Sequence, residues 1–572
     1  MKLLLRYLRP CARSMSFGLS IKVLATLLEL MLPFILSHIL DVIVPRHSVP
    51  QILLWGGAML LCAIGSYFGN VIANRNAARV ARDASRHIRH DLFEATMHLS
   101  AKQTDHFTIP SLESRLTSDT YNVHHFIGMM QRMGVRAPML LLGGMAITLF
   151  LDWRLALILL AILPLIGVAV FAIARRGLPL YKKNQQAVDS MVRVVREDCQ
   201  GVRVVKALSR EEYEKARFDA ANTALVRAER RAGVVMATSQ PVMSLLLHVG
   251  LSLVIALGAI FVQGGVSAPG RIIAFMQYFT LMSTAMSVIT RIFAQYSKCM
   301  ASAARIDEVI CAAKQREKAQ NADTCAQNAP HISFENVSFS YNGRRDNLKN
   351  VSFSLPRGGT LGIIGATGAG KTTLVQLLMR FYDADRGRIL IDGCDVRALN
   401  EKELRARFGV VMQNDFIYAD TVAENIRFGR KISDEQMRRA AQLAQAEEFI
   451  EAFPKKYEHP LTTKGTNVSG GQRQRLLIAR ALAGDPEILV LDDASSALDY
   501  RTDANLRAAI KSHSHATTVI VAQRVSSVMH ADHILVLEDG AVLAAGKHEE
   551  LLSTCPTYRE ISESQMGGAI LD

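Results

Sequence analysis

The stretch Leu361–Met379 has the sequence L-G-I-I-G-A-T-G-A-G-K-T-T-L-V-Q-L-L-M, and it decides the fold of the second half of the chain. Leu361–Ile364 is typical of a buried strand, and Leu374–Met379 has a helical pattern. The segment between them matches G-x-x-x-x-G-K-[ST] in the strand–loop–helix setting that a phosphate-binding loop requires. Its glycines let backbone N–H groups approach phosphates, and the N-terminus of the following helix favours their negative charge. The stretch therefore predicts an α/β domain that binds a nucleotide.

A second buried strand, Ile488–Leu491, ends in Asp492 and Asp493. A carboxylate at the end of a strand beside the phosphate loop is typical of a Mg²⁺ ligand, which is the role we expect of Asp492, and Asp493 is expected to hold the attacking water. Lys371 is predicted to reach the β- and γ-phosphates and the Thr372 hydroxyl to bind Mg²⁺. The predicted nucleotide-binding residues of the loop are Gly365, Ala366, Thr367, Gly368, Ala369, Gly370, Lys371, Thr372 and Thr373.

The first half of the chain is dominated by long apolar stretches. Six of them are long enough to cross a membrane as helices, which takes about 20 residues; they lie at 16–44, 51–74, 126–150, 155–174, 241–263 and 272–293. The connections alternate between short ones and two long basic ones, Arg75–His125 and Arg175–Met236. Basic residues mark the cytoplasmic side. We therefore expect a multi-pass protein of the plasma (inner) membrane with its N-terminus, long connections and nucleotide-binding domain in the cytoplasm.

The composition of the 572 residues excludes several classes of protein. Apolar residues make up 49% of the chain, which is too many for a disordered protein. Eight cysteines are scattered without a C-x-x-C pair, which argues against a zinc module or a disulfide scaffold. The net charge of +14 would suit nucleic acid or the inner face of a membrane. Because the basic residues gather in the two long connections, membrane orientation explains the charge and no nucleic-acid partner is expected.

Periodicity and composition divide the chain into three parts. We predict a transmembrane domain at 1–311, a polar linker at 312–330 and a nucleotide-binding domain at 331–572. Long structureless loops are uncommon, so the two long connections are expected to be helix pairs that turn around Lys102–Pro110 and Gly201–Arg210. The predicted fold class is an all-α six-helix transmembrane domain with long cytoplasmic helical extensions, fused to an α/β P-loop domain.

A further motif makes the resemblance to a family specific. Ser469, Gly470, Gly471 and Gln472 lie between the phosphate loop and Asp492, and Ser496, Ala497, Leu498 and Asp499 follow. With six preceding spans, the chain resembles a half-transporter of the ATP-binding cassette exporter family over nearly its whole length.

The resemblance implies a working unit of two cassettes. ATP with Mg²⁺ would lie between the phosphate loop of one cassette and the Ser469–Gln472 signature of the other, with Ser496–Asp499 as a dimer loop. It also implies that Tyr341 stacks on adenine and that Gln413 contacts Mg²⁺.

Two positions depart from the family pattern. The catalytic base after the Mg²⁺ aspartate is normally Glu, but here it is the shorter Asp493, and the switch histidine is replaced by Gln523. Glutamine can hydrogen-bond a phosphate but cannot carry a proton or a positive charge. The chain thus resembles the degenerate-site subunit of bacterial heterodimeric multidrug-type exporters, whose partner half-transporter has an intact Glu and His. The alternatives are a homodimer with two slow sites and a nucleotide-gated membrane regulator.

The substrate is the least defined part of the prediction. Glu29 lies in the middle of the first span, where an ionisable residue indicates either a contact for cationic compounds or an interhelical hydrogen bond. Met282 and Met286 in the last span suit an adaptable binding surface, although ordinary packing is favoured at helical spacing. A small molecule, a drug, a lipid and a peptide all remain open as the substrate.

Overall fold

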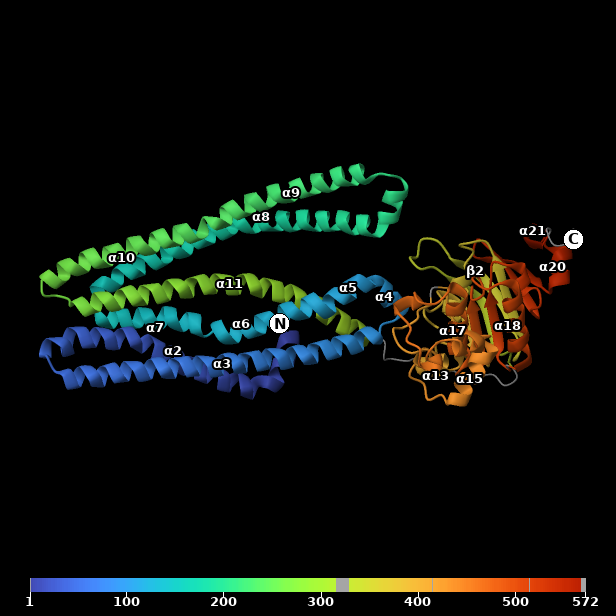
Figure 1. The fold of residues 1–572 in the computed structure, drawn as a ribbon, viewed down its shortest axis with the longest axis horizontal. Coiled ribbons are helices and arrows are strands. Elements are labelled where there is room, and N and C mark those ends of the chain that lie inside the picture. Colours follow the sequence, from blue (N-terminus) through green and yellow to red (C-terminus); the bar gives the residue numbers. More distant parts are fainter. Residues whose placement is uncertain (1, 315–328, 414, 514, 567–572) are drawn as a thin grey trace. The chain divides into compact units, whose positions relative to one another are not determined.

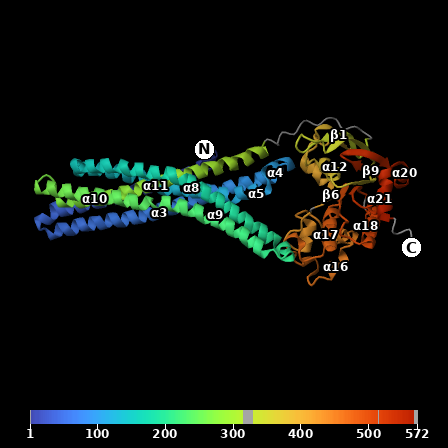
Figure 2. The ribbon, with the colours of Figure 1, turned by 90° about the horizontal axis from the view of Figure 1, so that it is seen from above.

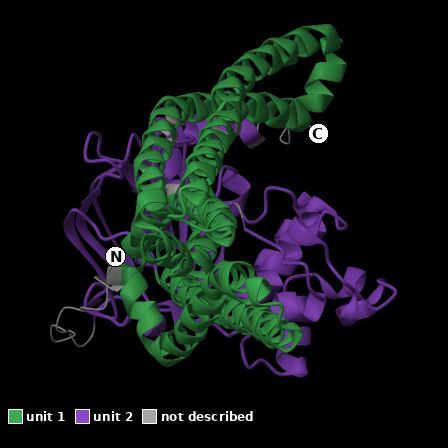
Figure 3. Ribbon diagram, turned by 90° about the vertical axis from the view of Figure 1, so that its left-hand side faces the viewer, with its two compact units in different colours: residues 1–98, 108–311 green, residues 99–107, 312–572 purple. Residues whose placement is uncertain are grey.

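The computed structural model describes residues 2–314, 329–413, 415–513 and 515–566. The chain forms two compact units, which are coloured separately in Figure 3. The first unit holds residues 1–98 and 108–311, and the second holds 99–107 and 312–572. Helix α11 continues to Lys314, so the first residues of the predicted linker are helical. The linker residues 315–328 lie outside the described part of the chain.

The first unit is all helical. Six of its described stretches are long and apolar enough to cross a membrane. Its helices are α1 (Lys2–Leu8), α2 (Ala12–His38), α3 (Val49–Met97), α5 (Ile109–Ser114), α6 (Thr120–Met133), α7 (Arg136–Leu151), α8 (Trp153–Ala207), α9 (Glu211–Ala237), α10 (Ser239–Gln263) and α11 (Pro269–Lys314), with short helical turns η1 (Arg9–Cys11), η2 (Ile39–Ile43), η3 (Val44–Arg46) and η4 (Arg115–Asp119). The fold class predicted for this half is thus confirmed.

The second long connection forms a helix pair, as predicted. Helices α8 and α9 run side by side in both Figure 1 and Figure 2. The chain reverses between Ala207 and Glu211, where Ser209 adopts a positive φ of 51°. Three glutamates in the first turn of α9 stabilise its N-terminus against the helix dipole. This reversal makes α8 and α9 antiparallel and leads the chain into its next candidate membrane span.

Close packing brings α2 against α3. A Cβ on Gly69 would lie 2.9 Å from the Cβ of Ala25, so only a glycine permits this approach. Farther along, Tyr278 of α11 is fully buried and its hydroxyl donates to the carbonyl oxygen of Leu30 at 2.6 Å. These contacts join the first and last spanning helices into one core.

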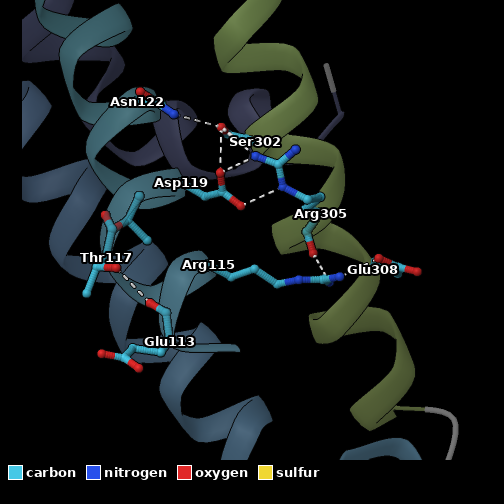
Figure 4. Close-up of polar contacts among 9 residues, drawn as sticks. Glu113, Arg115, Thr117, Asp119, Asn122, Ser302, Arg305 and Glu308 are labelled. Atoms are coloured by element: carbon cyan, nitrogen blue, oxygen red, sulfur yellow. Dashed lines mark hydrogen bonds and ion pairs between the residues drawn. The ribbon is translucent and has the colours of Figure 1, made fainter. Parts of the chain in front are cut away.

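A polar network links η4 and the start of α6 to α11 (Figure 4). Asp119 is buried in the π-helical turn η4, and it accepts hydrogen bonds from Ser302 at 2.8 Å and from the guanidinium group of Arg305. Arg115 donates to the carbonyl oxygen of Arg305 at 2.7 Å and to Glu308 at 3.0 Å. The network holds the third and sixth spanning segments together in their extensions.

The second unit is built on two sheets. The strands are β1 (Ile332–Phe339), β2 (Leu348–Leu355), β3 (Thr360–Gly365), β4 (Arg386–Ile391), β5 (Cys394–Asp395), β6 (Phe408–Val411), β7 (Ile488–Asp492), β8 (Thr517–Val521), β9 (His533–Glu538) and β10 (Ala541–Gly546). One sheet has the order β2-β1-β4-β5 and is antiparallel; the other has the order β10-β9-β3-β8-β7-β6, and its strands from β9 to β6 are parallel.

Helices cover both sheets and complete the α/β domain. They are α12 (Lys371–Leu378), α13 (Glu401–Ala406), α14 (Val422–Arg427), α15 (Asp434–Leu443), α16 (Glu447–Glu451), α17 (Gly470–Leu482), α18 (Tyr500–His513), α19 (Val525–Val528), α20 (His548–Thr554) and α21 (Pro556–Met566). Strands β3, β7 and β8 are neighbours in the parallel sheet. Ligand sites in such sheets form outside the carboxyl ends of the strands, which here carry the phosphate loop, Asp492 and Gln523.

Helix α4 (Ala101–Phe107) belongs to the second unit although it follows α3 in the chain. The hydroxyl of Tyr382 donates to the carboxylate of Asp105 in α4. The side-chain amide of Gln103 donates to the carbonyl oxygen of Ala312 at 2.9 Å. The turn predicted around Lys102–Pro110 is thus a short helix that packs with the nucleotide-binding domain.

Candidate functional site

The phosphate loop connects β3 directly to α12. Gly370 has a φ of 97°, and a Cβ there would lie 2.8 Å from the carbonyl oxygen of Asn347. A Cβ on Gly365 would lie 2.2 Å from the carbonyl oxygen of Leu537. Both positions therefore exclude any side chain, and the bare backbone of the loop can approach a phosphate closely.

Lys371 is folded over the loop that it follows. Its ammonium group donates to the carbonyl oxygens of Gly365 at 2.7 Å and Ala366 at 2.8 Å. Burial lowers the pKa of Lys371, whereas the carboxylates of Asp492 and Asp493 raise it. The cation therefore lies near both the loop carbonyls and the two acidic residues.

Asp492 lies at the end of β7 and is 1% exposed. Burial raises the pKa of its carboxyl, whereas the nearby Thr372 hydroxyl lowers it. Its Oδ2 atom is buried without a hydrogen-bond partner in the described part of the chain. Thr372, Asp492 and Gln413 line one cavity. Because Mg²⁺ prefers oxygen ligands of this kind, these residues fit the predicted metal.

The cavity has a volume of about 200 Å³, and both departures from the family pattern lie in its wall. Asp493 has a φ of 54°, and its backbone N–H donates to the carbonyl oxygen of Val521 at 2.9 Å. Burial raises the pKa of the Asp493 carboxyl, whereas Lys371 and Arg524 lower it. Gln523 follows β8 and lines the same cavity. The structure thus brings together the phosphate loop and both unusual residues.

Tyr341 lies beside the phosphate loop rather than within the cavity wall. Its hydroxyl donates to Gln376 at 2.6 Å and lies 3.2 Å from the hydroxyl of Thr373. Its ring packs edge to face with that of Tyr382, with 5.1 Å between the centroids. Tyr341 is 41% exposed, so its ring has a free surface on which a base can stack.

The signature residues lie at the N-terminus of α17 and not in the cavity wall. The Ser469 hydroxyl accepts from the Gln472 N–H at 3.2 Å, and the Gln472 side chain accepts from the Ser469 N–H at 2.9 Å, which forms a capping box. Ser469 and Gly470 are exposed. The first N–H groups of a helix have no acceptor within it, so this end of α17 can bind an anion.

The predicted dimer loop packs against the signature helix. The Gln474 side chain of α17 donates to the Ser496 hydroxyl at 3.0 Å and accepts from the N–H of Ala497 at 2.9 Å. A Cβ on Gly471 would lie 3.2 Å from the carbonyl oxygen of Ala497. The loop continues through Leu498, which is buried, to Asp499, which accepts from the N–H of Thr502. Signature and loop therefore form one surface.

Some residues of the site have no signal in the sequence. Asn347, Val521 and Ala522 line the cavity through their place in the fold, and Gln565 of the distant helix α21 contacts the backbone on both sides of Arg524. No motif marks them, because they reach the site only through the sheet order and the packing of α21.

The candidate substrate residues of the transmembrane unit have different surroundings. Glu29 accepts from Arg136 at 2.7 and 3.2 Å, so it forms the interhelical contact that was one of its two interpretations. Met282 is fully buried in the helix core, and a Cβ on Gly144 would lie 3.1 Å from it. Met286 is partly buried and packs against the same core. The packing interpretation therefore holds for Met282 within this chain.

Known proteins resemble the chain over nearly its full length. Residues 15–286 match the family described as ABC transporter transmembrane region, and residues 348–496 match the family described as ABC transporter. An uncharacterized ABC transporter ATP-binding protein of Bacillus subtilis, YfiB, is 34% identical over 98% of both chains. The putative multidrug export ATP-binding/permease protein YgaD of the same organism is 30% identical over 98% of both chains. A solved bacterial Atm1-family ABC exporter with ATP bound is 25% identical, with a TM-score of 0.83 over 97% of this chain and 99% of that one.

Proposed function

This chain belongs to the ATP-binding cassette exporter family, and we propose that it is one half of a heterodimeric exporter and carries the weaker of two ATP sites. Its cassette would work in the cytoplasm, and its partner would be a second half-transporter with an intact catalytic Glu and switch His. Cargo would be a small molecule, a drug, a lipid or a peptide. ATP and Mg²⁺ are the cofactors that the proposal requires.

The observation that carries the proposal is the presence of Asp493 and Gln523 in one cavity wall with Lys371. A general base must reach within about 2.6–3.2 Å of the proton that it removes. Aspartate is one methylene shorter than glutamate, and its main chain is held by the hydrogen bond to Val521. A misplacement of about 1 Å can lower a rate about 100-fold. Burial raises the pKa of Asp493, so the proposed loss rests on the shorter reach of this carboxylate and not on a weaker base.

The replacement of the switch histidine by Gln523 removes a second contribution to ATP hydrolysis. A histidine can donate a charge-assisted hydrogen bond to a developing phosphate charge, whereas a glutamine donates only a neutral one, which is roughly half as strong. Both losses affect the same nucleotide, so the chain would bind ATP firmly through Lys371 but turn it over slowly.

The signature supports the other half of the proposal. Ser469 and Gly470 are exposed at the start of α17, and their chain's own nucleotide cavity does not include them among its described lining residues. A signature that serves ATP bound to a second chain needs this exposure. The chain would thus complete an active site whose catalytic Glu and His come from the partner.

Two substitutions in this chain separate the two roles. In the assembled transporter, Ser469→Ala is expected to lower ATP hydrolysis about tenfold or more, because it removes a phosphate donor from the fast site. Asp493→Asn is expected to change the rate by less than about twofold, since the slow site contributes little. Equal loss in both variants would contradict the proposal and favour two equivalent sites.

Ser433→Ala is the matched control for Ser469→Ala. Ser433 caps α15 with the same capping box, formed with Gln436, but lies outside the nucleotide cavity and the signature. Both variants lose a helix cap, which costs about 1 kcal/mol of stability. Only the Ser469 variant is expected to lose activity, which separates the chemistry from folding.

A further inference from the structure

A histidine and two carboxylates meet in the second unit, away from the nucleotide cavity. His331 immediately precedes β1, Asp392 immediately follows β4, and Glu487 immediately precedes β7. One ligand atom of each residue lies within 4.8 Å of the others. The parallel strands β3 and β7 carry the phosphate loop and Asp492 at their carboxyl ends, whereas Glu487 lies at the amino end of β7. The group is therefore separate from the ATP site, and the described lining residues of that cavity include none of the three.

Hydrogen bonds hold this group where the two sheets meet. The N–H of Asp392 donates to the carbonyl oxygen of His331 at 3.0 Å, and the N–H of Thr517 donates to the carbonyl oxygen of Glu487 at 2.9 Å. Nδ1 of the His331 ring lies 2.6 Å from the hydroxyl oxygen of Thr517, the first residue of β8. The histidine of the antiparallel sheet is thus fixed to the parallel sheet through its ring.

The second ring nitrogen of His331 has no partner. The residue is 2% exposed, and Nε2 is buried without a hydrogen bond in the described part of the chain. It lies 3.9 Å from Oδ1 of Asp392, which is too far for a hydrogen bond. A buried polar atom without a partner is costly. With the ring proton on Nδ1, toward Thr517, Nε2 keeps its lone pair for a metal, which is the usual arrangement of a histidine ligand.

Two arginines compete for the same carboxylates. Arg357 contacts Oδ1 of Asp392 at 2.8 Å, and Arg407 contacts Oδ2 at 2.9 Å. Both lie 3.8 Å from Oε2 of Glu487. The Arg357 side chain is 59% exposed, so it can turn to solvent and release Oδ1 while Arg407 keeps Oδ2. A cation can therefore replace Arg357 beside Asp392, provided that a further ligand favours it.

We propose that His331, Asp392 and Glu487 bind a divalent transition-metal ion of the Zn²⁺ class, with water as the remaining ligand. Imidazole nitrogen and carboxylate oxygen bind Zn²⁺ at about 2.0–2.2 Å, whereas Mg²⁺ and Ca²⁺ prefer oxygen alone. Tetrahedral ligand atoms at that distance lie roughly 3.4 Å apart, so the present separations would close by at most about 1.4 Å. The side chains of Asp392 and Glu487 are 34% and 46% exposed and can make this movement. The ion would join the two sheets of the cassette.

The test measures Zn²⁺ binding by equilibrium dialysis. The full-length chain is purified in detergent in the assembly that it forms in the membrane, without a polyhistidine tag, and is dialysed against Zn²⁺ with millimolar Mg²⁺ and no nucleotide. Every sample carries His90→Asn, because His90, Asp91 and Glu94 offer a second group of ligand atoms. In this background, His331→Asn is expected to bind one Zn²⁺ fewer per copy of the chain.

A second ligand variant guards against misfolding of the first. Glu487→Gln changes a side chain that is 46% exposed, so the core stays intact, and it is expected to weaken Zn²⁺ binding about tenfold or more. The matched control is Glu538→Gln at the exposed end of β9, which is expected to have no effect. Unchanged stoichiometry and affinity in both His331→Asn and Glu487→Gln would overturn the proposal.

Arg357→Gln separates metal binding from a cluster of ion pairs. Removal of the competing guanidinium group is expected to tighten Zn²⁺ binding about fivefold, since the ion no longer has to displace an exposed pair. Arg386→Gln is the control, because Arg386 forms an exposed pair with Asp346 elsewhere in the same unit. Unchanged or weaker binding in Arg357→Gln would contradict the assignment of Asp392 as a ligand and overturn the proposal.

Thermal unfolding shows whether the ion stabilises the folded chain. Zn²⁺ is expected to raise the melting temperature of the His90→Asn background but not that of the same chain with His331→Asn, because an ion bound only to the folded state stabilises it. His533→Asn, at the start of β9 and outside the group, is the control and should respond like the background. An equal rise in all three would place the bound ion elsewhere and overturn the proposal. No ATP turnover is measured, so failure of the proposed heterodimer would leave these results unchanged.

Discussion

The side-chain amide of Gln565 donates a hydrogen bond to the backbone carbonyl oxygen of Gln523 at 2.9 Å. Its amide oxygen accepts from the backbone N–H of Val525 at 2.8 Å. One side chain of α21 thus holds the segment that carries the residue at the switch-histidine position. Gln565 does not line the nucleotide cavity and is a positioning residue.

Gln565→Ala is expected to loosen this segment and to weaken ATP binding roughly threefold to tenfold, because two hydrogen bonds of about 1 kcal/mol each are lost. Gln565→Glu keeps the acceptor for Val525 and should have an intermediate effect. The measurement is the affinity for a fluorescent ATP analogue, with Glu563→Ala on the same helix as the control. Equal affinity in all three variants would show that α21 does not position Gln523.

Restoring the family residues one at a time tests the cause of slow turnover. Asp493→Glu alone is not expected to give fast hydrolysis while Gln523 remains, because the developing phosphate charge still lacks a cationic donor. The double variant Asp493→Glu with Gln523→His is expected to raise single-turnover hydrolysis at this site by about 100-fold. Full turnover in the single variant would refute the assignment of two separate losses.

The buried carboxyls of the nucleotide site give the cassette a pH dependence. Burial raises the pKa of Asp492 and Asp493. Since a raised pKa favours the protonated form in the folded state, their contribution to stability is present at low pH and is lost as the pH rises through the raised pKa. Compared with wild type, Asp492→Asn is expected to lose less thermal stability between mildly acidic and neutral pH, measured without nucleotide or Mg²⁺.

Mg²⁺ is expected to reverse the difference in thermal stability between the wild type and Asp492→Asn. At neutral pH, Mg²⁺-ATP is expected to raise the melting temperature of the wild type more than that of Asp492→Asn, because the wild-type carboxylate gains a cation. Equal stabilisation of both proteins would contradict the assignment of Asp492 as a metal ligand.

The network around Asp119 is expected to stabilise the transmembrane unit. Asp119→Ala removes the acceptor for both Ser302 and Arg305 (Figure 4). Because the Arg305 side chain is 49% exposed and can turn to solvent, the expected loss of stability is about 1–3 kcal/mol. The loss is measured by thermal unfolding in detergent. Glu113→Ala, at an exposed position of α5, is the control and should change little.

Much of the nucleotide site can be predicted from the sequence because its motifs are local. The loop from Gly365 to Lys371 defines its own strand, turn and helix, and Asp492 is marked by the buried strand before it. The six spans follow from apolar length alone. Residues that reach the site only through tertiary packing could not be predicted in this way. Gln565 is one example, since nothing in α21 indicates where that helix packs.

Charge pairing within the membrane also could not be predicted. The sequence places Glu29 in a span, but its partner Arg136 is 107 residues away and begins α7. Only the folded structure shows that the carboxylate is paired and that Lys22 is not.

The most direct test of the central claim is the ATPase activity of the purified chain, measured alone and after co-expression with the product of the neighbouring reading frame. The account predicts activity only with the partner, lost when the partner's catalytic Glu is changed and retained in Asp493→Ala. Robust activity of the chain alone, abolished by Asp493→Ala, would contradict it and would mean a homodimer in which Asp493 and Gln523 carry out the chemistry.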